Sequence, residues 1–591
     1  MPPIASHHSL RLVRSSSTGI LLLSDSVNFP SHVIATNYIC LTHVIRLTDM
    51  FNDDTKEHDE EKVELYSRSA GDSNELNISH DFDEAIEAAG YGLFNVLLIL
   101  AILPGAWANF FDTTVMSYVL PVAECDLQIT FFQKGMLNAA VFAGMFTAAF
   151  PWGVLADTKG RRTLLRLGYC CDCICNILCS MSQNFYVLLT FKFLSGCIMS
   201  GPYAVNMTYL AEFHSVKYRS KVVLWARLFP SLGSIVLPGL AWIVIPQPWS
   251  FTLFNGTFVY NSWRIFILIC SMPALLGFII LRFLPESPRF LMSQGRSEEA
   301  MEVFRRIYAM NTGKAPETFP VKALRQDDPK RKTEAVDTSR RASVWEKIRN
   351  GGAQVMPLFQ KPYFCHFLLI ITIQFGGLLS LNTLRLWMPQ LFTLMEDFKH
   401  KKHNVGIGRP TLCNMISTPS NSNFTTYDEI NSTMAKTCDV VPVYSRVYIN
   451  SIILAITIVI ACSIAGSLVN RIGKKNLLLV AFLIPAVCAF LLNWSPNSDA
   501  TLTLLAIYMA SGNVSVTTII SFTVDLMPTT LRATAVTLAM AAGRIGAMFG
   551  NLLFPLLLST GCMAPFIFVG GFLLACFSLS IFIPKPPSRL M

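Results

Sequence analysis

Gly153-Val-Leu-Ala-Asp157-Thr-Lys-Gly160-Arg161-Arg162 is the stretch that decides the fold, because the chain carries a second copy of its pattern. The copy reads Gly466-Ser-Leu-Val-Asn470-Arg471-Ile-Gly473-Lys474-Lys475 and begins 313 residues later (466 − 153). Both copies combine a glycine, a polar residue four positions on and a basic pair at the end. A repeat at this spacing indicates an internal duplication.

A second pair of charged residues keeps the same offset. Glu212 and Arg219 are matched by Asp525 and Arg532, which also lie 313 residues further on (525 − 212 and 532 − 219). Two gapless matches in one register predict that the chain consists of duplicated halves. Duplication within an apolar chain is typical of two-lobed membrane transporters.

The composition is that of a membrane protein. Hydrophobic residues make up 52% of the chain and charged residues 14%, whereas ordinary soluble domains are about 25% charged. A soluble core could not bury so much apolar surface, but a bilayer can. The formal net charge is +9, yet the basic residues form no continuous face, so we expect no binding of nucleic acid.

Apolar spans of about 20 residues, the length needed to cross a bilayer, occur twelve times. We therefore predict an all-α membrane protein with twelve transmembrane helices in two pseudo-symmetric six-helix lobes. The predicted spans are 93–121, 134–155, 164–182, 186–211, 222–245, 264–283, 363–395, 446–469, 476–494, 501–525, 533–559 and 563–583.

The loops between these spans alternate in charge. Basic loops alternate with short loops that are almost free of Lys and Arg, which places the basic loops and both termini in the cytosol. The residues that set this pattern are Lys159, Arg161, Arg162, Lys217, Arg219, Lys221, Arg471, Lys474, Lys475 and Arg532.

The spans define the domain organisation. The polar N-terminal tail is poor in aromatic residues, so we expect it to be mostly disordered. The predicted parts are the cytosolic tail 1–92, the first lobe 93–283, a basic cytosolic inter-lobe segment 284–362, the second lobe 363–583 with an extracytosolic loop 396–445, and a cytosolic tail 584–591.

The extracytosolic loops carry candidate modification sites. The sequons at Asn255, Asn423 and Asn431 lie on the side where glycosylation occurs. Cys413 and Cys438 share one oxidising loop, and we predict a disulfide between them, with two free thiols as the alternative.

Other loop and cysteine features carry less information. Ser343 follows Arg340-Arg341 in the inter-lobe segment, at the spacing that basophilic kinases prefer. Five cysteines between positions 170 and 179 resemble a metal cluster on paper, but they fall inside a span without His partners, so we expect no metal site.

No motif for covalent catalysis occurs, such as a nucleotide cradle, a metalloprotease signature or a nucleophile elbow. We therefore expect no enzyme activity and no cofactor. The chemistry to explain is charge inside a membrane, where an ionisable residue at mid-helix costs about 2.5–3.5 kcal/mol on insertion scales.

Arg544 is the clearest of these intramembrane charges. It lies twelve residues beyond Arg532, about 18 Å along a helix and so near the midplane. Gly543 and Gly546 beside it leave room for a substrate. We consider two interpretations equally: a binding-site cation for an anionic solute, or a structural arginine paired with Asp112 or with helix carbonyls.

The other polar residues within spans have more varied expected roles. Asp112, beside two phenylalanines, is a candidate proton carrier because burial favours its neutral form. Asp172 is expected to make a structural contact, and Arg385 to extend outward to the membrane surface. The expected substrate-site residues beside Arg544 are Asp112, Asn109, Lys192, Gln374, Asn382 and Asn513. The alternative role of the amides Gln374, Asn382 and Asn513 is to link helices.

The repeated loop motifs have a mechanical interpretation. Asp157 can accept hydrogen bonds from a facing helix, while Arg161 and Arg162 can bind carboxylates or lipid phosphates. Forming and breaking such contacts would latch the lobes as the site alternates between faces. The expected gate residues are Gly153, Asp157, Gly160, Arg161, Arg162, Gly466, Arg471 and Lys474, the pairs Glu212 with Arg219 and Asp525 with Arg532, and Arg227 beside Glu212.

At its first charged motif the chain resembles the major facilitator superfamily. The segment from Lys134-Gly-Met-Leu to Arg162, with Ser262-Trp-Arg264 and Pro285-Glu-Ser-Pro-Arg289-Phe, is most similar to the synaptic vesicle glycoprotein 2 family. That family is related to organic cation and organic anion carriers. The resemblance implies that Lys192 matches the basic residue of the fourth-helix motif. It also implies that a basic residue at position 544 suits an anion.

The chain departs from that family in three places. The first-helix pair Asp-x-x-Glu is replaced by Asn109-Phe-Phe-Asp112, so one acid is lost. The extracytosolic loop is short and without evident repeats. The sugar-porter signature is missing at Gln374-Phe-Gly-Gly-Leu-Leu-Ser, which makes a hexose a less favoured substrate.

These observations predict a secondary transporter that moves a small polar, anionic organic solute by alternating access, with possible proton coupling through Asp112. We expect a monomer in the plasma membrane or in a secretory or synaptic vesicle membrane. The alternative is a membrane protein similar to synaptic vesicle glycoprotein 2 that acts in vesicle traffic without transport. The intact gate motifs favour transport, and the lost first-helix acid favours the alternative.

Overall fold

The computed structural model describes residues 79–226, 228–253, 258–324, 356–402, 412–417, 444–528 and 531–584. All of these belong to one unit, Ile78–Met591. The described part is almost wholly helical, as the apolar spans predict. Eleven helices are long and apolar enough to cross a membrane, which confirms the predicted fold class.

The first half forms six spans that follow the predicted ranges closely. The fifth span is described as α8 and α9 on either side of Arg227, which lies outside the described residues, and the sixth as α10 and α11, which meet at Ser271. The elements are α3 (Leu93–Leu127), α4 (Phe131–Thr147), α5 (Ala149–Lys159), α6 (Arg161–Ser180), α7 (Phe185–Glu212), α8 (Val216–Ala226), α9 (Leu228–Val244), α10 (Ser262–Cys270) and α11 (Met272–Ile280).

The second half repeats this arrangement with longer uninterrupted helices. Its elements are α16 (Phe364–Lys402), α18 (Ser445–Ile472), α19 (Lys474–Leu491), α20 (Ser498–Leu526), α21 (Arg532–Thr560) and α22 (Met563–Ile581).

The predicted span 134–155 is not among the eleven helices that are long and apolar enough to cross a membrane. It consists of α4 and α5, which meet at Ala148. Pro151 explains the break, because proline has no backbone N–H to donate to the carbonyl of Thr147. The break leaves carbonyl groups of the last turn of α4 available to other partners.

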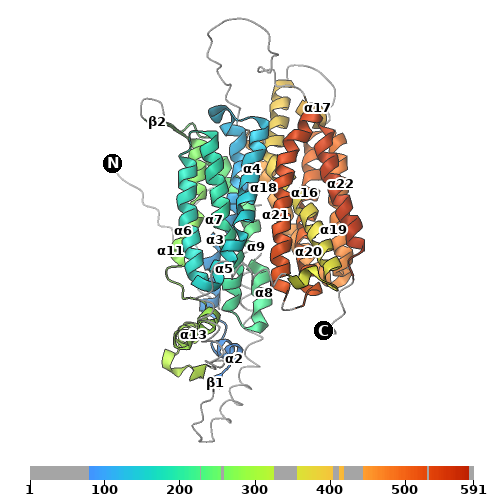
Figure 1. Ribbon diagram of the computed structural model, residues 1–591. Helices are drawn as coiled ribbons and strands as arrows, with labels where there is room; N and C mark the ends of the chain where they lie inside the picture. Colours follow the sequence, from blue (N-terminus) through green and yellow to red (C-terminus); the bar gives the residue numbers. More distant parts are fainter. Residues whose placement is uncertain are drawn as a thin grey trace, which may run out of the picture. The chain divides into compact units, whose positions relative to one another are not determined.

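Each half packs as a helical lobe, and several pairs of described helices join the lobes. Within the first lobe α7 packs against α4 and α6, and within the second α16 packs against α21 and α19 against α20. Across the interface α4 packs on α21, α9 on α18 and α3 on α16. Figure 1 shows these helices side by side, from blue-green in the first half to orange-red in the second.

Glycines let some of these helices approach until their backbones touch. A Cβ atom on Gly144 would lie 2.1 Å from the carbonyl oxygen of Phe193, and one on Gly196 would lie 2.2 Å from that of Val141. Close approach through small residues is the usual way helices associate in a membrane.

Short elements gather at the end of the bundle that carries Gly160 and Gly473, which we call the motif end (Figure 1). They are β1 (Ser79–His80), which pairs in parallel with β4 (Ala323–Leu324), α2 (Phe82–Ala88), α12 (Pro288–Ser293), α13 (Ser297–Thr312), η1 (Pro316–Thr318) and η2 (Met356–Phe359).

The expected disorder of the N-terminal tail does not extend to α2. Asn311 of α13 holds the segment that joins α2 to α3. Its Nδ2 donates to Ala89 O (3.2 Å) and Gly90 O (2.9 Å), and its Oδ1 accepts from Phe94 N (2.9 Å). Because this anchor comes from a residue more than two hundred positions away, local composition could not reveal it.

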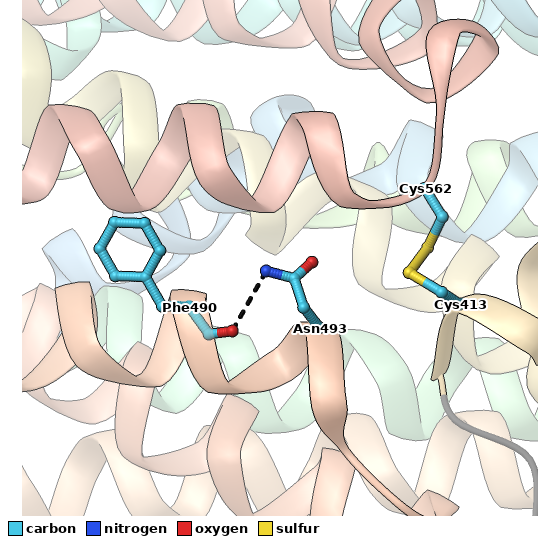
Figure 2. Close-up of a disulfide and its surroundings, with 4 residues drawn as sticks. All are labelled: Cys413, Phe490, Asn493 and Cys562. Carbon is cyan, nitrogen blue, oxygen red and sulfur yellow. Dashed lines mark hydrogen bonds between the residues drawn. A yellow bond between two sulfur atoms is a disulfide. The ribbon is translucent and has the colours of Figure 1, made fainter.

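The opposite end, which we call the disulfide end, carries α17 (Leu412–Ser417), η3 (Leu492–Trp494) and a hairpin of β2 (Ser250–Leu253) with β3 (Phe258–Asn261). Cys413 of α17 is bonded to Cys562, between α21 and α22, with their Cα atoms 5.5 Å apart (Figure 2). Nearby, Asn493 Nδ2 donates to Phe490 O at 3.1 Å.

The predicted partner of Cys413 was therefore wrong. Leu412 N donates to Ser495 O at 3.1 Å, so α17 lies against η3, and this contact brings Cys413 beside a cysteine 149 residues away in sequence. Cys438 lies outside the described residues.

Candidate substrate site and gates

A buried polar cluster lies inside the first lobe, between α3, α6 and α7. Asn176 Nδ2 donates to Asp112 Oδ1 (2.8 Å) and to Asp172 Oδ1 (3.1 Å). Lys192 Nζ donates to Asn176 Oδ1 (3.0 Å) and lies 3.7 Å from Asp112 Oδ1. Ser195 Oγ donates to Asp172 Oδ1 at 3.2 Å. All five side chains are at most 5% exposed.

This cluster contains two carboxyl groups and one ammonium group. If all three were ionised, an excess negative charge would be buried, which is costly in a medium of low dielectric constant. Asp112 Oδ2 is buried without a hydrogen-bond partner. The arrangement can therefore hold a proton, and it assigns Asp172 a place beside Asp112 that the sequence did not indicate.

Arg544 lies where the two lobes meet. Its Nη1 donates to Met145 O (3.1 Å) and to Ser200 Oγ (3.2 Å), both in the first lobe. Ser200 Oγ also donates to Met145 O at 2.8 Å. Met145 is in the last turn of α4, where free carbonyls and the helix dipole favour a cation.

Of the structural alternatives for Arg544, the carbonyl contact is present and the Asp112 pairing is not, because Asp112 pairs with Lys192. The guanidinium carbon of Arg544 lies 5.4 Å from the centre of the Tyr203 ring. Within the described part of the chain, no ion pair joins Arg544 to a carboxylate.

The four amide side chains differ in how far they are satisfied. Asn382 Nδ2 donates to Leu378 O (3.1 Å) and Asn513 Nδ2 to Met509 O (2.9 Å), each within its own helix. Gln374 Nε2 meets the sulfur of Met540 at 3.7 Å. Gln374 Oε1 and Asn109 Nδ2 are buried without partners, so these two are the better candidates for contact with a solute.

At the motif end, the predicted ion pairs are wrong in their partners. Glu212 Oε1 lies 3.4 Å from Arg161 Nε, and Arg219 pairs with Asp83 instead. Asp525 Oδ2 lies 2.6 Å from Lys474 Nζ, and no ion pair joins it to Arg532 among the described residues. The acidic residues reach back to the start of α6 and α19, because those helices begin beside the ends of α7 and α20.

Arg219 and Arg532, the basic residues of the predicted pairs, have other neighbours. Arg219 Nε donates to Ala211 O (3.2 Å), and its Nη2 lies 3.8 Å from Asp83 of α2. Arg532 Nε is buried without a hydrogen-bond partner.

Glu286 contacts the candidate gate residue Arg162, and the sequence analysis did not assign it a role. Its carboxylate accepts from Arg162 N (2.8 Å) at the first turn of α6, where free N–H groups favour an anion. The Arg162 side chain donates to Leu281 O (3.0 Å) and Arg282 O (2.8 Å). Gly160 has φ +90° and a Cβ atom there would lie 2.7 Å from Glu286 Oε2, so glycine is required.

The remaining gate glycines stand in open space. A Cβ atom on Gly153 or Gly466 would meet nothing within 4 Å, and Arg471 is exposed. Several predicted sites lie outside the described residues or side chains. They are Arg227, Asp157, Asn255, Ser343, Asn423 and Asn431.

At the disulfide end the lobes are in direct contact. Lys134 Nζ of α4 donates to Glu124 Oε2 (2.7 Å) and, across the interface, to Gln390 Oε1 (3.2 Å). The rings of Phe131 and Trp387 also meet across the interface, with centroids 4.9 Å apart. Lys134 is almost fully buried, and its position near the start of an apolar span was the available sequence signal.

No group of three or more His, Cys, Asp or Glu residues is arranged to hold a metal ion among the residues that the structure describes. The cysteines of α6 are free thiols.

Comparison with known proteins identifies the families and solved structures that this chain matches. The family model described as sugar (and other) transporter matches residues 97–396, and the one described as Major Facilitator Superfamily matches residues 444–590. The xylose transporter XylE from E. coli, in a partially occluded inward-open conformation, is similar with a TM-score of 0.57 and 16% identity, over 83% of this chain and 100% of that chain. A D-xylose-proton symporter has a TM-score of 0.55 and 14% identity, over 84% and 99%.

Curated relatives include three synaptic vesicle glycoproteins. Synaptic vesicle glycoprotein 2B of Homo sapiens is 23% identical over 85% of this chain and 86% of its own length. The 2B protein of Rattus norvegicus is 27% identical over 56% of this chain, which spans about half of that relative (50%). The 2C protein of Mus musculus is 30% identical over 48% and 39%.

The sequence match, the two helical lobes and the repeated loop motifs agree. The chain is a multi-pass integral membrane protein that belongs to the sugar (and other) transporter family of the major facilitator superfamily and resembles the synaptic vesicle glycoproteins 2.

Proposed function

We propose that this protein is a secondary transporter that moves a small polar, anionic organic solute by alternating access. The observation that carries the proposal is Arg544. It is a guanidinium at the meeting of the lobes, held by one carbonyl and one hydroxyl of the first lobe, without a carboxylate partner in the described part of the chain. A cation that is not neutralised by the protein favours an anionic ligand.

The contacts between the lobes support a conformation in which the carrier is closed at the disulfide end. Lys134, Phe131, Gln390 and Trp387 join the lobes at the disulfide end. At the motif end, the described ion pairs Arg161–Glu212 and Lys474–Asp525 each lie within one lobe. Rocking the lobes about the central contacts would open the first set and bring the motif loops together.

We further propose that the motif end faces the cytosol, in a plasma or vesicle membrane. The basic loops support this orientation. The disulfide of Cys413 with Cys562 lies at the opposite end, where an extracytosolic environment would allow oxidation.

Coupling to protons is the third part of the proposal. Asp112 and Asp172 share one ammonium group, that of Lys192, inside the first lobe. One proton on this cluster would balance its charge. Loss of that proton would change the charge at the side of the lobe that carries Asn109 and Asp112, beside the proposed solute site.

Uptake into proteoliposomes tests the proposal, with anionic, cationic and neutral probes and with or without an inward proton gradient. We expect anion uptake that Arg544→Gln abolishes and Arg544→Lys partly retains. Arg446→Gln is the matched control, because Arg446 is an exposed arginine of α18 in the same lobe and has no proposed role in binding or gating. Folding is followed by the melting temperature of each purified variant.

Two results would overturn the proposal. Unchanged anion uptake in Arg544→Gln would remove the role of this cation. No uptake of any probe by correctly folded protein would instead favour the alternative, a membrane protein that acts in vesicle traffic without transport.

A further inference from the structure

Arg385 of α16 is a second cation at the lobe interface, close to the proposed solute site. Its guanidinium carbon lies 5.5 Å from the centre of the Phe110 ring, which belongs to α3 of the other lobe. Phe110 stands between the two candidate residues Asn109 and Asp112 in sequence. Arg385 therefore turns toward the first lobe, although the sequence suggested that it extends outward to the membrane surface.

The Arg385 side chain is poorly satisfied by the protein. Its Nε atom is buried without a hydrogen-bond partner. In the described part of the chain no ion pair joins Arg385 to a carboxylate. Asp112, the buried acid two residues after Phe110, is paired with Lys192. A contact with an aromatic face partly stabilises a cation, but it leaves the donor groups of the guanidinium free for an anion.

Arg385 and Arg544 each face an aromatic ring of the first lobe. The guanidinium carbon of Arg544 lies 5.4 Å from the centre of the Tyr203 ring, as that of Arg385 lies 5.5 Å from the centre of the Phe110 ring. Both cations of the second lobe thus point across the interface toward the first lobe.

The packing of α16 on α21 shows at which levels along the two helices Arg385 and Arg544 lie. The helices run in the same direction, because Gly546 meets Phe375 and Gly550 meets Thr383. This register places Arg544 level with about residue 375, so Arg385 is ten residues further toward the disulfide end. At 1.5 Å per residue the levels differ by about 15 Å, and long side chains can close part of that distance.

We propose that Arg385 and Arg544 together form a two-cation site that selects extended organic dianions. Arg544 binds one acid group near the end of α4, and Arg385 binds the other beside Phe110. The rings of Phe110 and Tyr203, which these arginines face, contact the apolar body of the solute. This inference rests on the proposed function, and it narrows the solute from an anion in general to one with two separated acid groups.

The test compares a dianion with a matched monoanion. The probes are adipate, suberate and sebacate, each beside its monomethyl ester, which has the same body and one charge fewer. Uptake is measured with wild-type protein, Arg385→Gln, Arg385→Lys and Arg544→Gln. We expect the wild type to prefer the dianions and Arg544→Gln to lose both kinds of probe. Arg385→Gln should lower dianion uptake about tenfold, a change of about 1.4 kcal/mol, and leave monoester uptake within about twofold.

The possible outcomes separate this inference from the one on which it rests. If the wild type carries both kinds of probe and Arg385→Gln lowers both equally or neither, the two-cation site is wrong and the anion carrier stands. If the wild type carries neither, the proposed function fails first.

If Arg385→Gln does not fold, two other measurements test the inference. Arg385→Lys keeps the charge, so we expect it to retain the preference for the dianion. The purified wild type should also be stabilised against heat more by suberate than by its monomethyl ester. Equal stabilisation by the two probes would overturn the inference without any variant.

Discussion

Arg161 Nε lies 3.4 Å from Glu212 Oε1, and this pairing of the start of α6 with the end of α7 is repeated in the second lobe. There Lys474 Nζ lies 2.6 Å from Asp525 Oδ2. Both partners are displaced by 313 residues (474 − 161 and 525 − 212), so the duplicated halves keep a tertiary contact as well as a motif. The register of the repeat was visible in the sequence, but the identity of the basic partner was not.

The two copies of this ion pair should differ in strength. Arg161 and Glu212 are 19% and 8% exposed, whereas Lys474 and Asp525 are 37% and 28% exposed. We expect a double-mutant cycle with Arg161→Gln and Glu212→Gln to give a coupling of about 1–3 kcal/mol, because low exposure weakens screening by solvent. The cycle with Lys474→Gln and Asp525→Asn should give at most about 1 kcal/mol.

Melting temperatures of the purified variants measure both cycles. The exposed pair Arg296 with Glu299 on α13 is the control, and its cycle should show no measurable coupling. Equal coupling in the two repeats, or a stronger pair in the second lobe, would contradict the prediction.

Glycine substitutions should separate close helix contacts from open positions. In Gly196→Ala the new methyl group would lie 2.2 Å from the carbonyl oxygen of Val141. A backbone atom cannot move aside as a side chain can, so we expect α4 and α7 to separate and stability to fall by about 1–3 kcal/mol or more. In Gly239→Ala, within α9, the methyl group would meet nothing within 4 Å, and alanine favours a helix by about 1 kcal/mol.

The two variants are compared by melting temperature and by recovery of monodisperse protein. Gly196→Ala should melt clearly below the wild type and Gly239→Ala at or above it. Equal melting temperatures of Gly196→Ala and Gly239→Ala would show that α4 and α7 are not in backbone contact.

The fold was largely predictable from the sequence because its signals are additive along the chain. Twelve apolar spans and one repeated motif predict the helices and the two lobes without knowledge of any single contact. The contacts themselves depend on how helices distant in sequence meet. Asn311 binds the start of α3, Glu286 binds the start of α6, and Asp172 joins Asp112 only after α3 and α6 pack.

The buried imidazole of His214 should make stability depend on pH. It lies between α7 and α8, is 1% exposed, and donates from Nδ1 to Leu210 O at 2.8 Å. Burial, with a smaller contribution from the charge of Arg219, lowers the pKa of His214 from 6.5 to about 4. The unfolded chain therefore takes up a proton at a higher pH than the folded protein does.

This difference in pKa sets the direction in which stability changes with pH. The stabilisation is fully present above about pH 6.5 and is lost progressively as the pH falls toward 4, by up to roughly 3 kcal/mol. His214→Gln should flatten this part of the pH profile of the melting temperature. An unchanged slope between pH 7 and about 5 in that variant would show that His214 does not cause it. His366, a histidine of α16 at the motif end, provides the control His366→Gln.

The disulfide between Cys413 and Cys562 should stabilise the second lobe at the end where α17 lies on η3. It closes a loop of 149 residues, and loss of a disulfide typically costs about 2–4 kcal/mol. We expect Cys413→Ser, Cys562→Ser and the double variant to lower the melting temperature by the same amount, because each removes the same bond. Cys365→Ser changes an exposed free thiol and should have no effect. Mass spectrometry of unreduced peptides should link Cys413 to Cys562. A link from Cys413 to Cys438 would contradict the observed pairing and restore the one that the sequence suggested.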